Sequence, residues 1–173
     1  MSLWDKMDSR RLLIDLSLWS GSLACLADSI KSFEQYADFL HVDVGDGHFI
    51  PSLLFFPDLV AAIRSLTDKP IHVHLMVDDP AAFIKDFAQA GANLITFHIE
   101  NKVDISSVIQ KIKHNKAAAG LAVQVETPVS AIEPFIDTID FVVLMGTALG
   151  IKGVGINEQA YSRLEAAKKI IRE

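Results

Sequence analysis

Two pairs of side chains that can bind a metal or move a proton stand at alternate positions of short apolar segments. His41 and Asp43 form one pair, and His72 and His74 form the other. Alternate side chains of an extended strand face the same side, so each pair points one way. Burying an unpaired polar group costs on the order of a few kcal/mol. A single buried histidine is usually a hydrogen-bonded core residue, but two such pairs on successive segments favour a functional site.

The chemistry of such a site follows from its ligand types. Imidazole nitrogens together with a carboxylate suit Zn²⁺, Fe²⁺, Mn²⁺ or Co²⁺. A metal of this kind polarises a carbonyl group and the hydroxyl beside it. A neighbouring carboxylate can then remove a proton from the carbon between them, which is the requirement for enediolate chemistry. The pattern by itself does not name the reaction.

The elements that position these residues alternate along the chain. Apolar runs of strand length, typical of parallel strands covered on both faces, occupy residues 12–18, 39–44, 71–77, 94–99, 119–125 and 141–145. Amphipathic stretches that predict helices occupy residues 23–35, 57–66, 81–90, 105–115, 129–136 and 157–171. Six such units without a dinucleotide-binding glycine motif indicate an α/β fold of the (β/α) barrel type. Functional sites of barrels lie where the strands end, so the two pairs are expected to converge there.

Length and composition limit the alternatives. The 173 residues predict one domain over 1–173, with residues 1–10 as an N-terminal extension. The net charge is −6 and lysines and arginines do not cluster, so neither nucleic acid nor a membrane surface is expected as a partner. The N-terminus lacks the apolar run of a signal peptide, and Cys25 alone cannot form an intramolecular disulfide. We therefore expect a cytoplasmic protein and a buried or half-buried, structural Cys25.

Five blocks of sequence carry a family resemblance. Residues 41–52 read HVDVGDGHFIPS and resemble the second-strand signature of the ribulose-phosphate 3-epimerase family, His-x-Asp-x-Met-Asp-Gly-x-Phe-x-Pro-Asn. Residues 74–76 read His-Leu-Met, as on the family's third strand. Further matches lie at 17–20, 90–98 and 126–129. On this resemblance the chain is identified as a member, with a ribulose-phosphate-binding TIM barrel as its expected fold and the first six βα units present.

The resemblance implies roles for particular residues. It implies a divalent metal held by His41, Asp43 and His74, and it makes Asp43 one of two acids that transfer protons. His98 resembles a family histidine on the fourth strand, and a core role and a site role are both open for it. Asp46, in the loop after the second strand, is interpreted as part of a turn.

The resemblance also implies residues that contact the substrate. Ser20 would contact it directly, and Met76 would line the site. Gly150 and Gly153 belong to a glycine-rich loop of the kind that binds phosphate through backbone N–H groups. Lys152 either adds a positive charge to that loop or faces solvent. One departure from the family is Gly45, which stands where the family has methionine and removes an apolar wall.

A second departure concerns the partner acid. The family carries it on a seventh strand in a Val-Asp-Gly-Gly context, and nothing after Met145 matches this. An incompletely represented enzyme is favoured over a natural protein without two barrel units, because the latter would leave open sheet edges. The resemblance suggests a homo-oligomer, and an open edge would strengthen that expectation.

Three functions are compatible with these residues. The leading hypothesis is metal-dependent epimerisation at C3 of a ketose phosphate, either ribulose 5-phosphate or a hexulose 6-phosphate, through an enediolate. The alternative is a non-catalytic relative that binds phosphosugars. A lyase or decarboxylase of related architecture is less favoured, because such enzymes pair an active-site lysine with an aspartate and no Asp-x-Lys occurs on a predicted strand.

Overall fold

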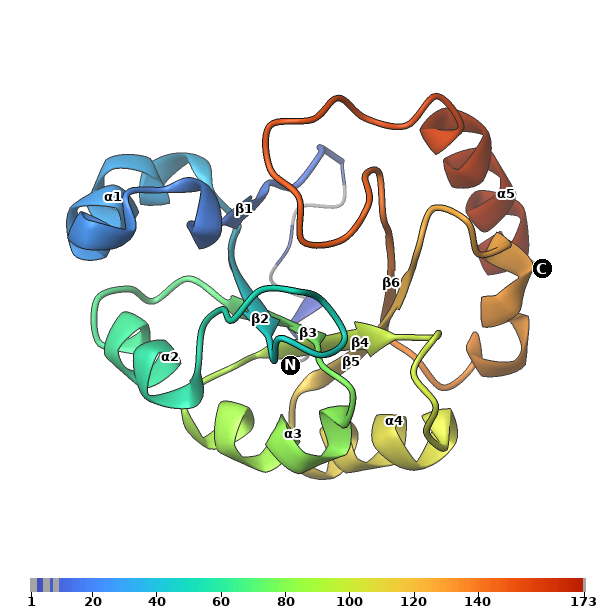
Figure 1. Ribbon diagram of the computed structural model, residues 1–173, viewed down its shortest axis with the longest axis horizontal. Coiled ribbons are helices and arrows are strands. Elements are labelled where there is room, and N and C mark those ends of the chain that lie inside the picture. Colours follow the sequence, from blue (N-terminus) through green and yellow to red (C-terminus); the bar gives the residue numbers. More distant parts are fainter. Residues whose placement is uncertain (1–2, 5–6, 8–9, 173) are drawn as a thin grey trace.

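The computed structural model describes residues 3–4, 7 and 10–172; residues 1–2, 5–6, 8–9 and 173 lie outside the description. Its strands are β1 (Asp15–Ser17), β2 (Phe39–Gly45), β3 (Ile71–Met76), β4 (Leu94–His98), β5 (Ala118–Val123) and β6 (Phe141–Leu144). They form one parallel sheet in the order β1 to β6. The sheet is curled and the helices surround it on the outside, so the fold is a partial (β/α) barrel of six units, as predicted (Figure 1).

The helices cover the outer face of the sheet. They are α1 (Leu26–Phe33), α2 (Pro57–Arg64), α3 (Pro80–Gln89), α4 (Ile105–His114) and α5 (Ala160–Arg172), with the 3₁₀ turns η2 (Leu18–Ser20), η3 (Leu23–Cys25), η4 (Glu34–Tyr36) and η5 (Val129–Phe135). The sequence sets their ends. Pro80 begins α3, where its missing N–H is no loss. Asp104 caps α4 by accepting the Ser107 backbone N–H at 3.2 Å.

Strand β2 has an apolar outer face and a polar inner face. Leu40, Val42 and Val44 of β2 are buried in the same apolar cluster as Ile84 and Phe87 of α3. Side chains alternate along a strand, so His41 and Asp43 lie on the opposite, inner face. The predicted parity of this strand is therefore confirmed.

The register of the sheet brings the two predicted pairs together. In the parallel pairing of β2 with β3, His41 stands opposite His72 and Asp43 stands opposite His74. On the other side of β3, His74 stands opposite Thr96 of β4. The inner face therefore carries a compact group of polar side chains, which must satisfy one another.

Three local predictions were wrong. The stretch 129–136 forms the 3₁₀ turn η5 rather than an α-helix, because Pro134 lies within it and offers no backbone N–H. Cys25 is exposed, since it ends η3 just before α1 begins. The first strand is limited to Asp15–Ser17, and Leu12 before it is 93% exposed.

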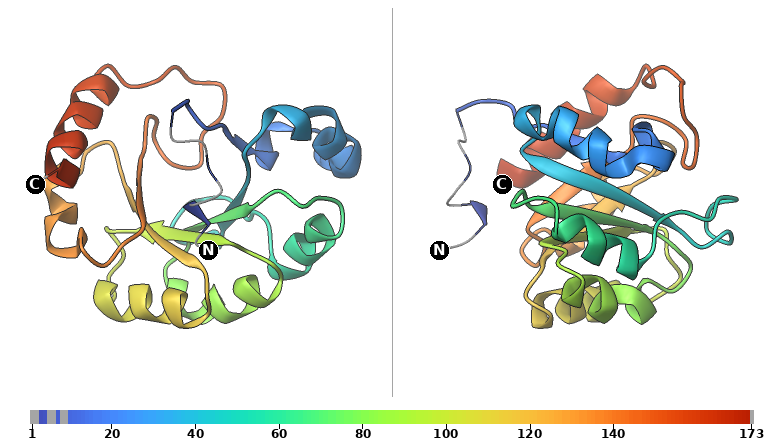
Figure 2. Two further views of the ribbon diagram at one scale, coloured as in Figure 1. Left: turned by 180° about the vertical axis from the view of Figure 1, so that it is seen from behind. Right: turned by 90° about the vertical axis from the view of Figure 1, so that its left-hand side faces the viewer.

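The described residues before β1 lie at the end of the barrel where the strands begin (Figure 2). The ring of Trp4 packs near Phe39 and Phe141, with centroid distances of 6.3 Å and 5.9 Å. The predicted extension 1–10 is thus only partly described, because six of its residues lie outside the description. Within the described ranges, no helix is long and apolar enough to cross a membrane.

Candidate active site

Asp43 is the centre of a cluster on the inner face of the barrel. Its Oδ1 lies 3.1 Å from His41 Nε2 and 3.6 Å from His74 Nδ1. Its Oδ2 accepts a hydrogen bond from Ser17 Oγ at 2.6 Å. The ligand atoms of His41, Asp43 and His74 all lie within 4.8 Å of one another. The structure therefore brings together the three residues that the sequence nominated as metal ligands.

Asp15 holds the other side of His41. Its Oδ2 lies 2.9 Å from His41 Nδ1 and 2.6 Å from His72 Nδ1. His72 Nε2 lies 2.6 Å from the hydroxyl of Thr96, so both nitrogens of this buried ring are engaged within the core. His72, the fourth member of the two pairs, thus supports Asp15 and does not face Asp43.

A second line of contacts leads away from His74. Its Nε2 lies 2.8 Å from Nε2 of His98, a ring with 0% exposure. His98 Nδ1 lies 3.2 Å from Glu100 Oε2, and Glu100 Oε1 accepts the backbone N–H of Gln124 at 2.8 Å. His98 is therefore attached directly to a candidate ligand.

Sequence reasoning missed Asp15, Ser17 and Glu100. The signal for the first two was the same alternation used for the second strand, because Asp15 and Ser17 are two residues apart in an apolar run. Glu100 follows its strand and had no such signal. Only the fold shows that it reaches His98.

The surrounding charges shift the ionisation of the cluster. Burial opposes the charged form of His41, but hydrogen bonds to Asp15 and Asp43 dominate and raise its pKa to about 10. Burial favours the protonated form of Asp43, yet hydrogen bonds from its neighbours, led by His41, hold its pKa well below the usual range. Burial lowers the pKa of His74 to about 3, so its ring is neutral. Asp43 is thus ionised between one cationic and one neutral imidazole.

These residues fit a divalent metal ion. His74 Nδ1 and Asp43 Oδ1 are too far apart, at 3.6 Å, to share a hydrogen bond. Two ligand atoms about 2.1 Å from one ion at a tetrahedral angle lie about 3.4 Å apart. Two imidazoles and a carboxylate are also the donor types that zinc and similar ions prefer.

A cavity of about 470 Å³ opens beside the cluster. Its lining residues are Ser17, Trp19, Ser20, Asp43, His74, Met76, Met145, Thr147, Ala148, Gly150, Ile151, Lys152 and Gly153. The cavity therefore joins the first strand, the cluster and the loop that follows β6. All four residues nominated for substrate contact, Ser20, Met76, Gly150 and Gly153, line it.

Lys152 is the only lysine or arginine among the described residues that line this cavity. Its ammonium group lies 4.3 Å from the centroid of the Trp19 ring and donates a hydrogen bond to the Trp19 carbonyl oxygen. This contact joins residues 133 positions apart. It holds a positive charge at the rim of the cavity.

Glycines shape the loops around the cavity. Gly150 and Gly153 have φ values of 70° and 72°, a region that side chains with a Cβ rarely adopt. At Gly45 a Cβ would lie 2.6 Å from the Ser52 carbonyl oxygen and 2.8 Å from Cδ1 of Ile50. The loop after β2 therefore fills the space that a larger residue at position 45 would need.

Asp46 organises that loop. Its Oδ1 accepts the backbone N–H groups of His48 and Phe49 at 2.8 Å and 2.9 Å, and its Oδ2 accepts that of Asp78 at 2.8 Å. The turn role predicted for Asp46 is confirmed. The same bonds connect the loops that follow β2 and β3.

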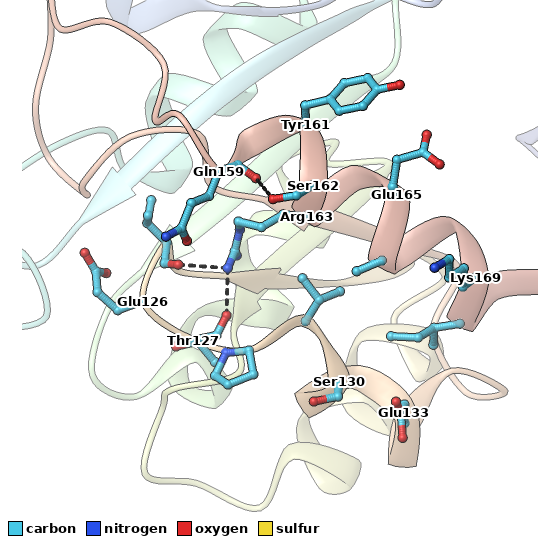
Figure 3. A pocket seen from close by; sticks show the side chains of 15 residues that line it. Glu126, Thr127, Ser130, Glu133, Gln159, Tyr161, Ser162, Arg163, Glu165 and Lys169 are labelled. Carbon is cyan, nitrogen blue, oxygen red and sulfur yellow. Dashed lines mark hydrogen bonds between the residues drawn. The ribbon is translucent and has the colours of Figure 1, made fainter.

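A larger hollow, of about 1010 Å³, lies elsewhere, between α5, η5 and the loop after β5 (Figure 3). Arg163 is drawn there with hydrogen bonds to the backbone, including one of 2.8 Å to the Thr127 carbonyl oxygen. None of the nominated site residues lines this hollow. The smaller cavity, which contains Asp43 and His74, is therefore the candidate active site.

Solved structures define the class of fold. A mutant tryptophan synthase alpha-subunit from Pyrococcus furiosus has a TM-score of 0.68 at 14% identity, covering 93% of this chain and 74% of that one. The HpcH/HpaI aldolase from Desulfitobacterium hafniense has a TM-score of 0.64 at 14% identity, covering 99% and 78%. At these identities the likeness concerns the barrel fold alone.

Sequence comparisons define the family. The sequence profile described as the ribulose-phosphate 3 epimerase family matches residues 13–173. The ribulose-phosphate 3-epimerase of Bacillus subtilis is 36% identical over 158 residues, which are 91% of this chain and 73% of that protein. The chloroplastic ribulose-5-phosphate-3-epimerase of Arabidopsis thaliana is 32% identical, covering 98% and 61%. The chain therefore belongs to the ribulose-phosphate 3 epimerase family, whose curated relatives are isomerases. The non-catalytic alternative gains no support from these relatives.

Proposed function

We propose that this protein epimerises a ketose phosphate at C3, with ribulose 5-phosphate or a hexulose 6-phosphate as substrate. The observation that carries the proposal is the Asp43 carboxylate, which lies between His41 and His74 and lines a cavity with Lys152 at its rim. The cavity thus offers a base, ligand atoms and a positive charge for a phosphate among its lining residues. The names of the relatives agree with this substrate class.

The proposed metal ligands are His41 Nε2, Asp43 and His74 Nδ1, with Zn²⁺, Fe²⁺, Mn²⁺ or Co²⁺ as the ion. When bound, such an ion supplies positive charge that stabilises the oxygens of an enediolate. Asp15 accepts the Nδ1–H of His41 and so leaves Nε2 toward the cluster. The chemistry of the donor set, rather than any single distance, supports this assignment.

The first proton transfer is assigned to Asp43. Oδ1 faces the two histidines, whereas Oδ2 contacts only the Ser17 hydroxyl among the bonds described above. We assign removal of the C3 proton to Oδ2, where Ser17 steadies the carboxylate. Epimerisation also returns a proton to the opposite face of C3, and we assign only the first transfer to a residue of this chain.

The test is exchange of the C3 proton of ribulose 5-phosphate with deuterium from solvent, in protein loaded with a divalent ion. Asp43→Asn should slow exchange by about 10²- to 10⁴-fold, because it removes the base. Asp58→Asn, an exposed carboxylate on α2, is the matched control and should leave exchange unchanged. Absence of exchange with both ribulose 5-phosphate and a hexulose 6-phosphate, at full metal occupancy, would overturn the proposal.

The substrate phosphate is assigned to the loop after β6. Gly150 and Gly153 line the cavity with positive φ angles in a glycine-rich loop, and Lys152 adds a charge held by Trp19. Ser20 and Met76 line the same cavity and are assigned to the sugar.

Replacing Lys152 should weaken binding of the substrate without slowing the chemical step. Lys152→Met should raise KM for ribulose 5-phosphate roughly tenfold while changing kcat little, because the charge acts on a group remote from C3. Weaker inhibition by inorganic phosphate should accompany it. Lys168→Met, an exposed lysine of α5, is the control. An unchanged KM in Lys152→Met would contradict the assignment of the phosphate.

The proposal extends to the partner, the oligomeric state and the location of the protein. A phosphorylated ketose is its proposed small-molecule partner, and a homo-oligomer in the cytoplasm is its proposed state. The acidic composition and the family support these choices. Among the relatives, the Arabidopsis protein is named as chloroplastic, so location varies within the family.

A further inference from the structure

A line of three side chains, two buried rings and the half-buried Glu100, runs from the candidate metal ligand His74 toward Gln124, the residue that follows β5. His74 Nε2 meets His98 Nε2 at 2.8 Å, and His98 Nδ1 meets Glu100 Oε2 at 3.2 Å. The two rings are 2% and 0% exposed. At the far end, Glu100 Oε1 accepts the backbone N–H of Gln124 at 2.8 Å.

Hydrogen-bond chemistry fixes where the protons of this line sit. Burial works against ionisation of Glu100, but hydrogen bonds led by that from His98 lower its pKa to about 2, so the carboxylate can only accept. His98 must therefore carry its proton on Nδ1. In a ring that carries its single proton on Nδ1, Nε2 is an acceptor, and His98 Nε2 lies 2.8 Å from His74 Nε2. His74 must then donate from Nε2, which leaves His74 Nδ1 with a free lone pair.

That free lone pair is the one that faces Asp43. His74 Nδ1 lies 3.6 Å from Asp43 Oδ1, and both atoms are then acceptors with no proton between them. A cation between the two would satisfy both. The Glu100 carboxylate, acting through the His98 ring, therefore determines that His74 Nδ1 keeps its lone pair.

We propose that Glu100 and His98 are positioning residues, which hold His74 in the tautomer with hydrogen on Nε2 and thereby present its Nδ1 to the metal. The part that concerns the metal rests on the proposed function; the tautomer does not. Neither residue lines the cavity, and neither is assigned contact with substrate.

Glu100→Gln should reverse the direction of each hydrogen bond between these side chains, because the glutamine side chain has the same shape as the glutamate. The Gln124 backbone N–H is a fixed donor, so the amide oxygen of the new side chain should turn toward it. The amide NH₂ then faces His98 Nδ1, which must become an acceptor. His98 would carry its proton on Nε2, and His74 would be driven to hold its own on Nδ1, where the metal should bind.

The experiment uses the full chain with metal removed, and records two-bond ¹⁵N–¹H correlation spectra of the histidine rings at pH 8. In the unsubstituted protein His74 should carry its proton on Nε2, and in Glu100→Gln it should carry it on Nδ1. The affinity for Zn²⁺ alone, measured by competition with a chelator, should fall roughly 10- to 100-fold in Glu100→Gln. Glu126→Gln, the same change on an exposed glutamate after β5, should alter neither readout.

Two results would overturn the proposal. One is a proton on Nδ1 of His74, or a doubly protonated His98, in the unsubstituted protein; this readout requires no variant to fold. The other is an unchanged His74 tautomer in a folded Glu100→Gln. Failure of the unsubstituted protein to bind any divalent ion would instead defeat the metal in the proposed function, while the spectra would still decide the tautomer.

Discussion

At the scale of single residues, the candidate site depends on carboxylates that accept hydrogen bonds from the histidine ring nitrogens on the side away from the cluster. Asp15 accepts from His41 at 2.9 Å, and Glu100 accepts from His98 at 3.2 Å. A ring whose far nitrogen is engaged in this way keeps one orientation and one tautomer. Asp43 is then the only carboxylate of the three that faces the cavity.

The Glu100 carboxylate makes the folding stability of the protein depend on pH. Its pKa is about 2 in the folded protein against an ordinary value of 4.5. Because the folded pKa is the lower one, its contribution is fully present above pH 4.5 and is lost as pH falls toward about 2. At pH 7 the free energy of unfolding of the unsubstituted protein should exceed that of Glu100→Gln by roughly 1–3 kcal/mol.

Urea unfolding of both proteins at pH 7, 4.5 and 3.5 measures this difference. It should shrink as the solution becomes more acidic, because protonation removes the charge from Glu100 itself. A difference that stays constant from pH 7 to pH 3.5 would mean that the carboxylate charge is not what stabilises this position.

At the scale of elements, Arg163 of α5 connects this helix to the loop after β5 through hydrogen bonds. Arg163 is 8% exposed and donates to the carbonyl oxygens of Val125 and Thr127 at 2.8 Å and of Gln124 at 2.7 Å (Figure 3). Pro134 keeps η5 short and non-α-helical in the same region. The loop after β5 therefore takes its hydrogen bonds from a neighbouring helix.

Arg163→Met should destabilise the fold by roughly 2–4 kcal/mol, because it leaves several backbone carbonyl groups without a donor. Arg163→Lys should be intermediate, since an ammonium group cannot reproduce the planar fork of the guanidinium. The free energy of unfolding in urea measures both. Lys169→Met, an exposed change on the same helix, should stay within about 0.5 kcal/mol. Equal effects of Arg163→Met and Lys169→Met would refute this role.

At the scale of the whole molecule, the candidate ligands lie in the middle of the fold. His41 and Asp43 belong to β2 and His74 to β3, the most extensively paired strands of the sheet. Losing that pairing means losing the site, so binding and folding should be linked. Within the described part of the chain, β1 pairs only with β2 and β6 only with β5.

A bound divalent ion should therefore stabilise the entire domain. At a Zn²⁺ concentration of 100 times Kd, the free energy of unfolding should rise by about 2.7 kcal/mol. Thermal or urea unfolding with and without the ion measures this gain. Asp43→Asn should abolish most of it, and a gain that persists in that variant would place the ion elsewhere.

The oligomeric state belongs to the same scale. Large apolar side chains on and near α5 are exposed, among them Tyr161 at 76%, Leu164 at 57% and Ile156 at 73%. The homo-oligomer stays a prediction, which sedimentation velocity across a range of protein concentrations would check. A single species with the mass of one chain at all concentrations would contradict it.

The sequence predicted most of what depends on neighbours along the chain. Six strands alternating with helices, and the shared face of His41 and Asp43, follow from periodicity, which is a local property. The periodicity failed at Val129–Phe135, where one proline outweighed the helical pattern, and at Cys25, where the helix begins at Leu26, three residues later than the pattern indicated.

The sequence by itself determined the family, the order of the elements and the residues His41, Asp43 and His74 as candidates. Only the tertiary structure decided what surrounds them: Asp15 behind His41, Glu100 behind His98, and Lys152 against Trp19. The physical reason is that these contacts depend on strand register and on the path of loops between elements distant in the chain. Periodicity encodes which face a side chain occupies, whereas packing selects the partner it meets there.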